Sequence, residues 1–194
     1  MTKKQTNTRE KILKVSGKLL AQRGYYGVSM NDIAEEMNFT KSSLYYHFKS
    51  KDHLVEELMK GSIADLKKRL RLSVEKSRLP SDVIFNVVKT LLDFKISHPE
   101  ISLLVKMGAT TDKKIPILEL ITELHIDLIK FIRELIGGVD LLRRFTYKAV
   151  FSFTTTMLGF VLSPLHSNDR SPKELAGDFT SFLFSGSESN LKTK

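Results

Sequence analysis

The stretch from residue 27 to residue 54, GVSMNDIAEEMNFTKSSLYYHFKSKDHL, most constrains the fold because it encodes two short helices and a tight turn. Ser29 and Asp32 have the spacing of a capping box, in which a serine oxygen and a carboxylate satisfy free N–H groups of a first helical turn. A helix is therefore predicted to begin directly after Ser29. It is predicted to end near Asn38, a residue that tolerates the left-handed backbone of a helix exit. Thr40 predicts the start of the second helix.

The second short helix has an apolar side and a polar, aromatic side. Leu44 and Phe48 lie one turn apart and are predicted to be buried. The other side carries hydroxyl, amine and imidazole groups, which suit DNA phosphates and base edges. We therefore expect a helix-turn-helix whose second helix enters the major groove, with a solvated helical hairpin as the alternative. The residues expected to bind DNA are Lys41, Ser42, Ser43, Tyr45, Tyr46 and His47, together with Ser29, Thr40 and the phosphate-binding Lys51.

This segment also resembles, position by position, the DNA-binding domain of the tetracycline-repressor (TetR) family. The resemblance covers roughly residues 8–58, and the rest of the chain is similar only in length and helical character. Ser42 and Asn38 depart from the family, which often has glycine at both positions, and Ser42 bears on which base edges are read. The matching residues are Gly24, Val28, Ser29, Asp32, Ile33, Ala34, Phe39, Thr40, Leu44, Tyr45, His47, Phe48, Ser50, Lys51, Asp52 and Leu54.

Charge and composition agree with an anionic partner and an intracellular setting. The 194-residue chain has a formal net charge of +9, and residues 1–53 hold ten Lys/Arg against five Asp/Glu. The absence of cysteine excludes disulfides and thiol catalysis and is compatible with a reducing cytoplasm. The polar N-terminus has no signal-peptide pattern, and residues 1–6 are expected to form a disordered basic arm. The longest uncharged apolar stretch, residues 149–162, is too short to span a bilayer, so we expect a cytoplasmic protein without a membrane partner.

The whole chain is predicted to be all-α. A first helix capped by Asn7 or Thr8 ends at Gly24, and a long helix capped by Ser50 runs to about Arg78. Gly61 within that helix predicts either a bend or a close packing contact. The expected domains are a three-helix helix-turn-helix domain, residues 1–53, and a larger helical ligand-binding and dimerisation domain, residues 54–194. The further helices expected are 81–97, 101–108, 115–136, 139–163 and 172–184.

The last two predicted helices suggest self-association. Thr155, Gly159 and Ser163 are spaced by four, so the backbone of a partner helix can approach closely. Ser171, with proline next and glutamate three residues on, signals the start of the final helix. These helices either complete a monomeric core or form an interface. In the TetR family the last two helices form a two-fold four-helix interface, so the resemblance implies a homodimer through residues 151–163 and 175–184.

No enzyme signature is present: the five histidines are scattered, and the chain has no HExxH, glycine-rich phosphate loop or GxSxG motif. We therefore predict no catalytic residue, cofactor or metal ligand. The C-terminal part exceeds what a dimer interface needs, and a helical bundle can house a pocket between its helices. The central faces of these helices are apolar and offer no arginine except Arg133. This composition favours a hydrophobic or aromatic effector over a phosphate. The candidate pocket residues are Phe85, Phe94, Met107, Leu118, Leu124, His125, Phe131, Phe151, Thr155 and Met157.

The sequence thus predicts a ligand-responsive DNA-binding regulator. By resemblance it is a homodimeric repressor that binds a palindromic double-stranded DNA operator and is released by a small hydrophobic or aromatic effector. Two alternatives keep the N-terminal domain and change the rest. One is a ligand-independent DNA-binding dimer with an architectural or recruitment role, and the other is a transcriptional activator on the same fold.

Overall fold

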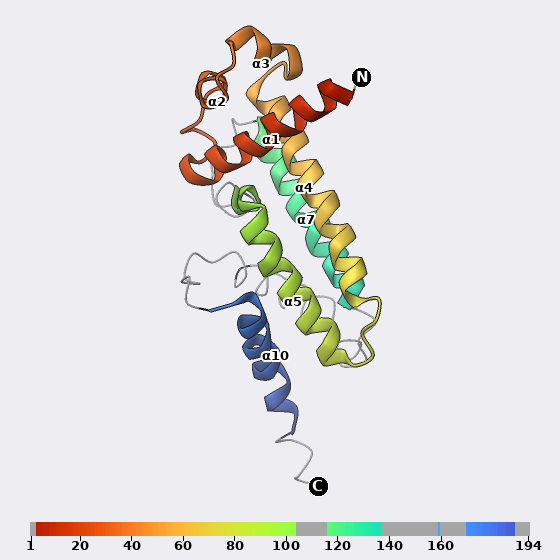
Figure 1. The fold of residues 1–194 in the computed structure, drawn as a ribbon. Coiled ribbons are helices and arrows are strands. Elements are labelled where there is room, and N and C mark those ends of the chain that lie inside the picture. The colour runs from red at the N-terminus through yellow and green to blue at the C-terminus, as the bar shows by residue number, and fades with distance from the viewer. Residues whose placement is uncertain (1–2, 104–115, 137–158, 160–169, 189–194) are drawn as a thin grey trace. The chain divides into compact units, whose positions relative to one another are not determined.

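The computed structural model describes residues 3–103, 116–136, 159 and 170–188 (Figure 1). Within these ranges the chain is helical and contains no strand, which confirms the all-α prediction. The predicted helix 139–163 lies outside the described residues except at Gly159. The elements are α1 (Lys3–Arg23), α2 (Met30–Glu36), α3 (Lys41–His47), α4 (Lys51–Val74), α5 (Pro80–Ser97), the 3-10 helix η1 (Pro99–Ser102), α7 (Pro116–Ile136) and α10 (Pro172–Glu188).

The chain forms two compact units. The first comprises Met1–Ala64 and His98–Ile126, and the second comprises Asp65–Ser97 and Asp127–Lys194. The first unit therefore holds α1, α2, α3, η1 and parts of α4 and α7. The second holds α5, α10 and the remainder of α4 and α7.

Helix α1 is longer than the sequence suggested. It begins at Lys3, so the prediction of a disordered arm is wrong for residues 3–6, and neither Asn7 nor Thr8 is its cap. Lysine and glutamine are good helix formers, so the helix extends beyond its packed region. Ile12 and Leu20 are fully buried on its inner side. The helix ends as predicted at Gly24, whose φ of 72° is left-handed and whose N–H donates to the Leu20 carbonyl at 2.8 Å.

Helix α4 begins where Ser50 predicted it. The His53 N–H donates to the Ser50 hydroxyl oxygen at 3.1 Å, which satisfies a free donor of the first turn. The helix ends at Val74, short of the expected Arg78. Among the described residues, nothing lies within 4 Å of a Cβ added at Gly61. The spacing of apolar residues in this helix predicts one buried side, and all but Val74, which is half-buried, are buried: Leu54, Leu58, Ile63, Leu66 and Leu70.

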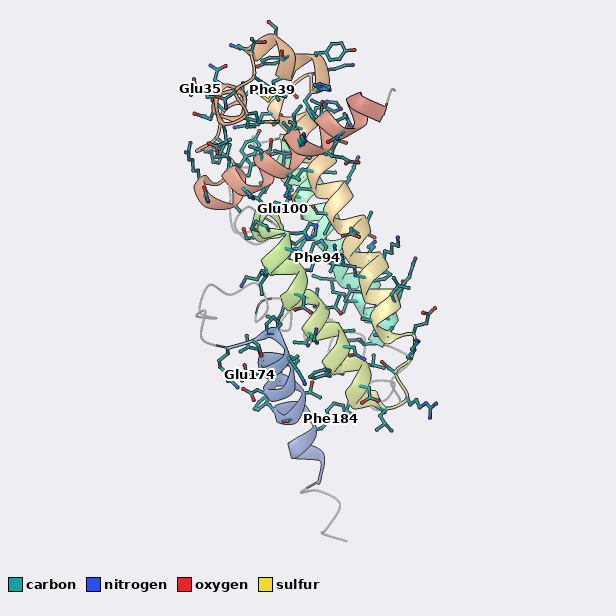
Figure 2. The ribbon with its side chains drawn as sticks, viewed as in Figure 1. Glu35, Phe39, Phe94, Glu100, Glu174 and Phe184 are labelled. Atoms are coloured by element: carbon teal, nitrogen blue, oxygen red, sulfur yellow. The ribbon has the colours of Figure 1, made fainter. Side chains whose placement is uncertain are left out.

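The segment after α5 differs from the predicted helix 101–108. Pro99 starts a 3-10 turn that ends at Ser102, and residues 104–108 lie outside the described part. Glu100 in this turn is only 5% exposed, and its carboxylate accepts a hydrogen bond from the Ser62 hydroxyl at 2.7 Å (Figure 2). A Cβ at Gly17 would lie 3.1 Å from Glu100 Oε2, so glycine leaves room for this buried acid. A short-range pattern cannot reveal such a contact between α1, α4 and η1.

In the second unit, α10 packs on α5. The predicted start signal of α10 is confirmed, because the Glu174 N–H donates to Ser171 Oγ at 3.3 Å and the Ser171 N–H donates to the Glu174 carboxylate at 2.8 Å. The Glu174 carboxylate accepts hydrogen bonds from the Ser171 hydroxyl and the Ser171 N–H. These two bonds, the one from the hydroxyl first, lower the pKa of Glu174 (Figure 2). Ala176 is fully buried, whereas Phe182 is 79% exposed. The helix continues to Glu188, four residues beyond its predicted end.

Candidate nucleic-acid interface

Helix α2 begins with the predicted capping box. The Asp32 N–H donates to Ser29 Oγ at 3.2 Å, and the Ser29 N–H donates to the Asp32 carboxylate at 2.6 Å. Hydrogen bonds from Ser29, chiefly from its hydroxyl, lower the pKa of Asp32. Ile33 is fully buried and orients the helix on the first unit. Ser29 is therefore engaged in capping while it remains exposed.

The turn between α2 and α3 has the predicted geometry. Asn38 has a φ of 55°, the left-handed conformation expected of it. The backbone N–H of the next residue, Phe39, donates to the backbone carbonyl of Ala34 at 2.8 Å. Thr40 then caps α3, because its Oγ1 accepts from the Ser43 N–H at 3.1 Å. The two short helices are thus joined by a tight turn that fixes their relative direction.

Helix α3 has two chemically distinct sides. Leu44 and Phe48 are fully buried, as their spacing predicted. Tyr46 is 73% exposed and Tyr45 is 42% exposed. Exposed aromatic rings and donors on a seven-residue helix leave a surface that can contact base edges and phosphates. The exposed residues on this side also include Lys41, Ser42 and Ser43, and His47 is half-buried.

Contacts within α3 arrange this exposed surface. The Lys41 ammonium lies 6.0 Å from the centre of the Tyr45 ring. The rings of Tyr46 and His47 meet edge to face at 5.2 Å. The Ser43 hydroxyl is 2.8 Å from Thr40 Oγ1. Ser43 and Thr40 therefore take part in capping, whereas Lys41, Tyr45 and Tyr46 project their polar ends outward.

Lys51 is placed differently from the other predicted DNA-binding residues. Its ammonium donates to the carbonyls of Tyr25 and Val28 at 3.0 and 3.1 Å, and it lies 3.9 Å from the centre of the Tyr25 ring. Burial lowers the pKa of Lys51, although the neighbouring Asp52 acts in the opposite direction. Two of its three N–H donors are thus already used within the protein.

A cluster of charged and aromatic side chains packs against the end of α3. The sequence did not reveal this cluster. Arg9 of α1 pairs through two nitrogens with the carboxylate of Glu57 in α4, and its guanidinium lies 4.6 Å from the centre of the Phe48 ring. His53 Nε2 lies 3.0 Å from Glu57 Oε1. The bond from Arg9 is the largest cause that lowers the pKa of Glu57. Charge spacing within one helix predicts i,i+4 pairs but not a pair separated by 48 residues.

The candidate pocket residues are only partly described. Met107, Phe151, Thr155 and Met157 lie outside the described residues. Leu118, Leu124 and His125 are half-buried in α7 within the first unit, and burial lowers the pKa of His125.

In the second unit two of the three candidate rings lie close to basic side chains of α4. Phe94, labelled in Figure 2, is 1% exposed, Phe131 is 8% exposed, and Phe85 is half-buried. The Arg69 guanidinium lies 5.3 Å from the Phe94 ring centre, and the Arg71 guanidinium lies 5.0 Å from that of Phe131. One face of each of these two rings is therefore covered by a cation.

The described residues contain no group of three or more His, Cys, Asp or Glu side chains placed to hold a metal ion. None of their helices has the length and apolar character needed to cross a membrane.

Comparison with known proteins agrees with this geometry. Residues 12–58 match the family model described as bacterial regulatory proteins, tetR family. The chain is 29% identical over 105 residues to the biofilm operon icaADBC HTH-type negative transcriptional regulator IcaR of Staphylococcus aureus, a match that covers 54% of this chain and 56% of IcaR. The chain therefore aligns with little more than half of that relative.

Solved structures share the fold over most of the chain. A TetR-family transcriptional regulator from Bordetella parapertussis has a TM-score of 0.75 at 21% identity, covering 91% of this chain and 94% of the other. The structure of AibR in complex with isovaleryl coenzyme A and operator DNA has a TM-score of 0.69 at 19% identity, covering 91% and 97%.

These observations define an all-helical protein with an N-terminal helix-turn-helix domain. Residues 12–58 match the tetR family of bacterial regulatory proteins, and the chain shares the fold of solved TetR-family regulators.

Proposed function

We propose that this protein is a ligand-responsive transcriptional regulator that binds a palindromic DNA operator as a homodimer. The observation that carries the proposal is α3, whose buried Leu44 and Phe48 leave Tyr45 and Tyr46 exposed beside Lys41. This arrangement suits a recognition helix in the major groove, where lysine donates to guanine acceptors and tyrosine packs on a thymine methyl group. Residues 1–53 form the DNA-binding domain of the proposal, and residues 54–194 form the ligand-binding and dimerisation domain.

Repression is the proposed outcome of DNA binding. IcaR is a negative transcriptional regulator by its name, and it is similar to this chain over 105 residues. A dimer would hold its two recognition helices about 34 Å apart, or a multiple of that distance, to match successive major grooves of a palindrome.

Release by a small effector is the second half of the proposal. The structure of AibR in complex with isovaleryl coenzyme A and operator DNA supports the binding of both a small molecule and DNA on this fold. An effector can shift the DNA-binding equilibrium only by its differential affinity for two states, a coupling of roughly 1 to 3 kcal/mol. The apolar character of α5 and α7, including buried Leu91, Leu92 and Ile121, favours a hydrophobic or aromatic effector.

The experiment that tests DNA binding is selection from random duplexes followed by titration of the selected operator. We expect a palindrome to be recovered, and Tyr46→Ala to change the base preference within each half-site by roughly 1 to 3 kcal/mol. Tyr26→Ala is the control, because Tyr26 is also an exposed tyrosine, at 67%, but lies outside α3. Recovery of no sequence preference, or an unchanged preference in Tyr46→Ala, would contradict the groove assignment. Hydrophobic and aromatic compounds added to the complex should release the DNA, whereas sugar phosphates and zinc should not.

A further inference from the structure

Lys51 differs from the other basic residues near α3 because its charge is directed into the protein. Its ammonium donates to the backbone carbonyls of Tyr25 and Val28, in the loop that connects α1 to α2. Its third neighbour is the face of the Tyr25 ring, 3.9 Å from the ammonium. Lys41, in contrast, is exposed on α3.

Tyr25 is held from both ends by the first turn of α4. Its carbonyl accepts from Lys51, and its hydroxyl donates to the carboxylate of Asp52. The ring is 9% exposed, and burial is the main cause that raises the pKa of its phenol, so the hydroxyl stays protonated as a donor. Two consecutive residues of α4 thus bind one residue of the α1–α2 loop.

The second carbonyl, that of Val28, fixes the entrance to α2. Val28 is 1% exposed and directly precedes Ser29, the cap of α2. A Cβ added at Gly27 would lie 2.3 Å from the Arg23 carbonyl oxygen, so this loop has a single tightly folded path. Because α2 and α3 are joined by a short turn, a shift of the α2 entrance moves the exposed side of α3 with it.

We infer that Lys51 is a positioning residue that sets the direction of α2 and α3 relative to α4, and is not a phosphate contact. The inference rests on the proposed function, since it concerns how the recognition helix is presented to DNA. A lysine whose ammonium already has two carbonyl acceptors and an aromatic face gains little from a phosphate and would lose these contacts to reach one. Lys51 therefore contributes to affinity through the orientation of α3.

Salt dependence of operator binding separates the two roles. Lys51→Met keeps the apolar stem and removes the ammonium, and Lys41→Met makes the same change on the exposed side of α3. We expect Lys51→Met to weaken binding about tenfold at every salt concentration. The magnitude of the slope of log K against log[salt] should change by much less than one unit in Lys51→Met, whereas in Lys41→Met this magnitude should decrease by about 1. A decrease of about 1 in the magnitude of the slope for Lys51→Met would overturn the inference.

Hydrogen exchange in the DNA-free protein gives a second readout that loss of a phosphate contact would not move. Lys51→Met should speed amide exchange in residues 25–33 about tenfold and leave residues 12–20 unchanged, because only the loop and α2 lose their anchor. Unchanged exchange in residues 25–33 would overturn the inference. Hydrogen exchange needs no DNA, so it still tests the role of Lys51 if the wild-type protein selects no operator. That outcome would contradict the proposed function and would leave the positioning role of Lys51 to be decided by the exchange measurement.

Tyr25→Phe provides the same test without a charge change if Lys51→Met does not fold. It removes only the hydroxyl bond to Asp52 and keeps the ring beneath the ammonium. We expect faster exchange in residues 25–33, weaker operator binding and an unchanged salt slope. Wild-type exchange and wild-type affinity in this variant would show that the contacts between α4 and the loop do not position α3.

Discussion

At the scale of single residues, the sequence predicted burial better than it predicted partners. Leu44 and Phe48 are buried because their spacing places them on one side of a helix. Lys51 illustrates the limit. The sequence predicted a phosphate contact for Lys51 and did not reveal its two carbonyl acceptors, which lie 23 and 26 residues away. No local pattern encodes contacts of that kind.

Leu44 provides the residue-scale prediction. It is fully buried within α3, so Leu44→Ala removes apolar contacts and leaves a cavity. We expect the free energy of unfolding to fall by about 2 to 5 kcal/mol, measured by urea denaturation. Tyr45→Ala, on the 42% exposed neighbour, should cost less than about 1 kcal/mol. Equal losses in the two variants would show that the sidedness of α3 is misassigned.

At the scale of elements, four helix starts were predicted correctly because capping is local, whereas the predicted start of α1 was wrong. Ser29, Thr40, Ser50 and Ser171 each cap the helix that the sequence assigned to them. Each cap acts over three residues, within reach of a sequence pattern. The ends of α4 and α10 and the 3-10 turn at Pro99–Ser102 were less accurate. Tertiary packing, such as that of buried Glu100, decides where such elements stop.

The Arg9–Glu57 pair between α1 and α4 gives the element-scale prediction. The folded-state pKa of Glu57 is lowered from its ordinary value of 4.5, so the pair stabilises the fold above that pH. This stabilisation is lost as pH falls from about 4.5 through the lower folded-state pKa. The difference in unfolding free energy between wild type and Glu57→Gln should therefore be constant above about pH 5 and shrink at lower pH.

A neighbouring glutamate supplies the control for this pH dependence. Glu56 pairs with Lys60 on the exposed side of α4, where such a pair contributes roughly 0.5 kcal/mol or less. Denaturant unfolding of wild type, Glu56→Gln and Glu57→Gln between about pH 3 and 7 measures the loss of unfolding free energy in each variant. This is roughly the range over which carboxylates titrate. A larger acid-dependent difference for Glu56→Gln than for Glu57→Gln would contradict the assigned role of the pair.

At the scale of the whole molecule, the all-α fold followed from the sequence, whereas the function of the C-terminal part did not. Helical periodicity and the absence of strand patterns are properties of the whole chain. A pocket depends on which faces of several helices meet, and periodicity does not encode this. Phe94 and Phe131 each have one ring face covered by an arginine, Arg69 and Arg71 respectively, and their place in a pocket stays a prediction.

Self-association is the prediction at this scale. Residues 175–184 belong to α10, which packs on α5 through one side and presents Phe182, 79% exposed, on the other. Gly159, in the other predicted interface segment, is exposed among the described residues. Burial of a large aromatic side chain contributes strongly to an interface, so we expect a second copy of the chain to cover this surface.

Light scattering after size exclusion at micromolar concentration measures the assembly directly. The native protein should have twice the mass of the chain, and Phe182→Glu should shift it toward the monomer, because an unpaired carboxylate would be buried at the interface. Leu72→Glu makes a similar apolar-to-acid change at a residue that is 58% exposed on α4, outside the predicted interface, and should remain dimeric. A monomeric native protein would defeat both the dimer and the palindromic operator, since two half-sites require two recognition helices held at a fixed spacing.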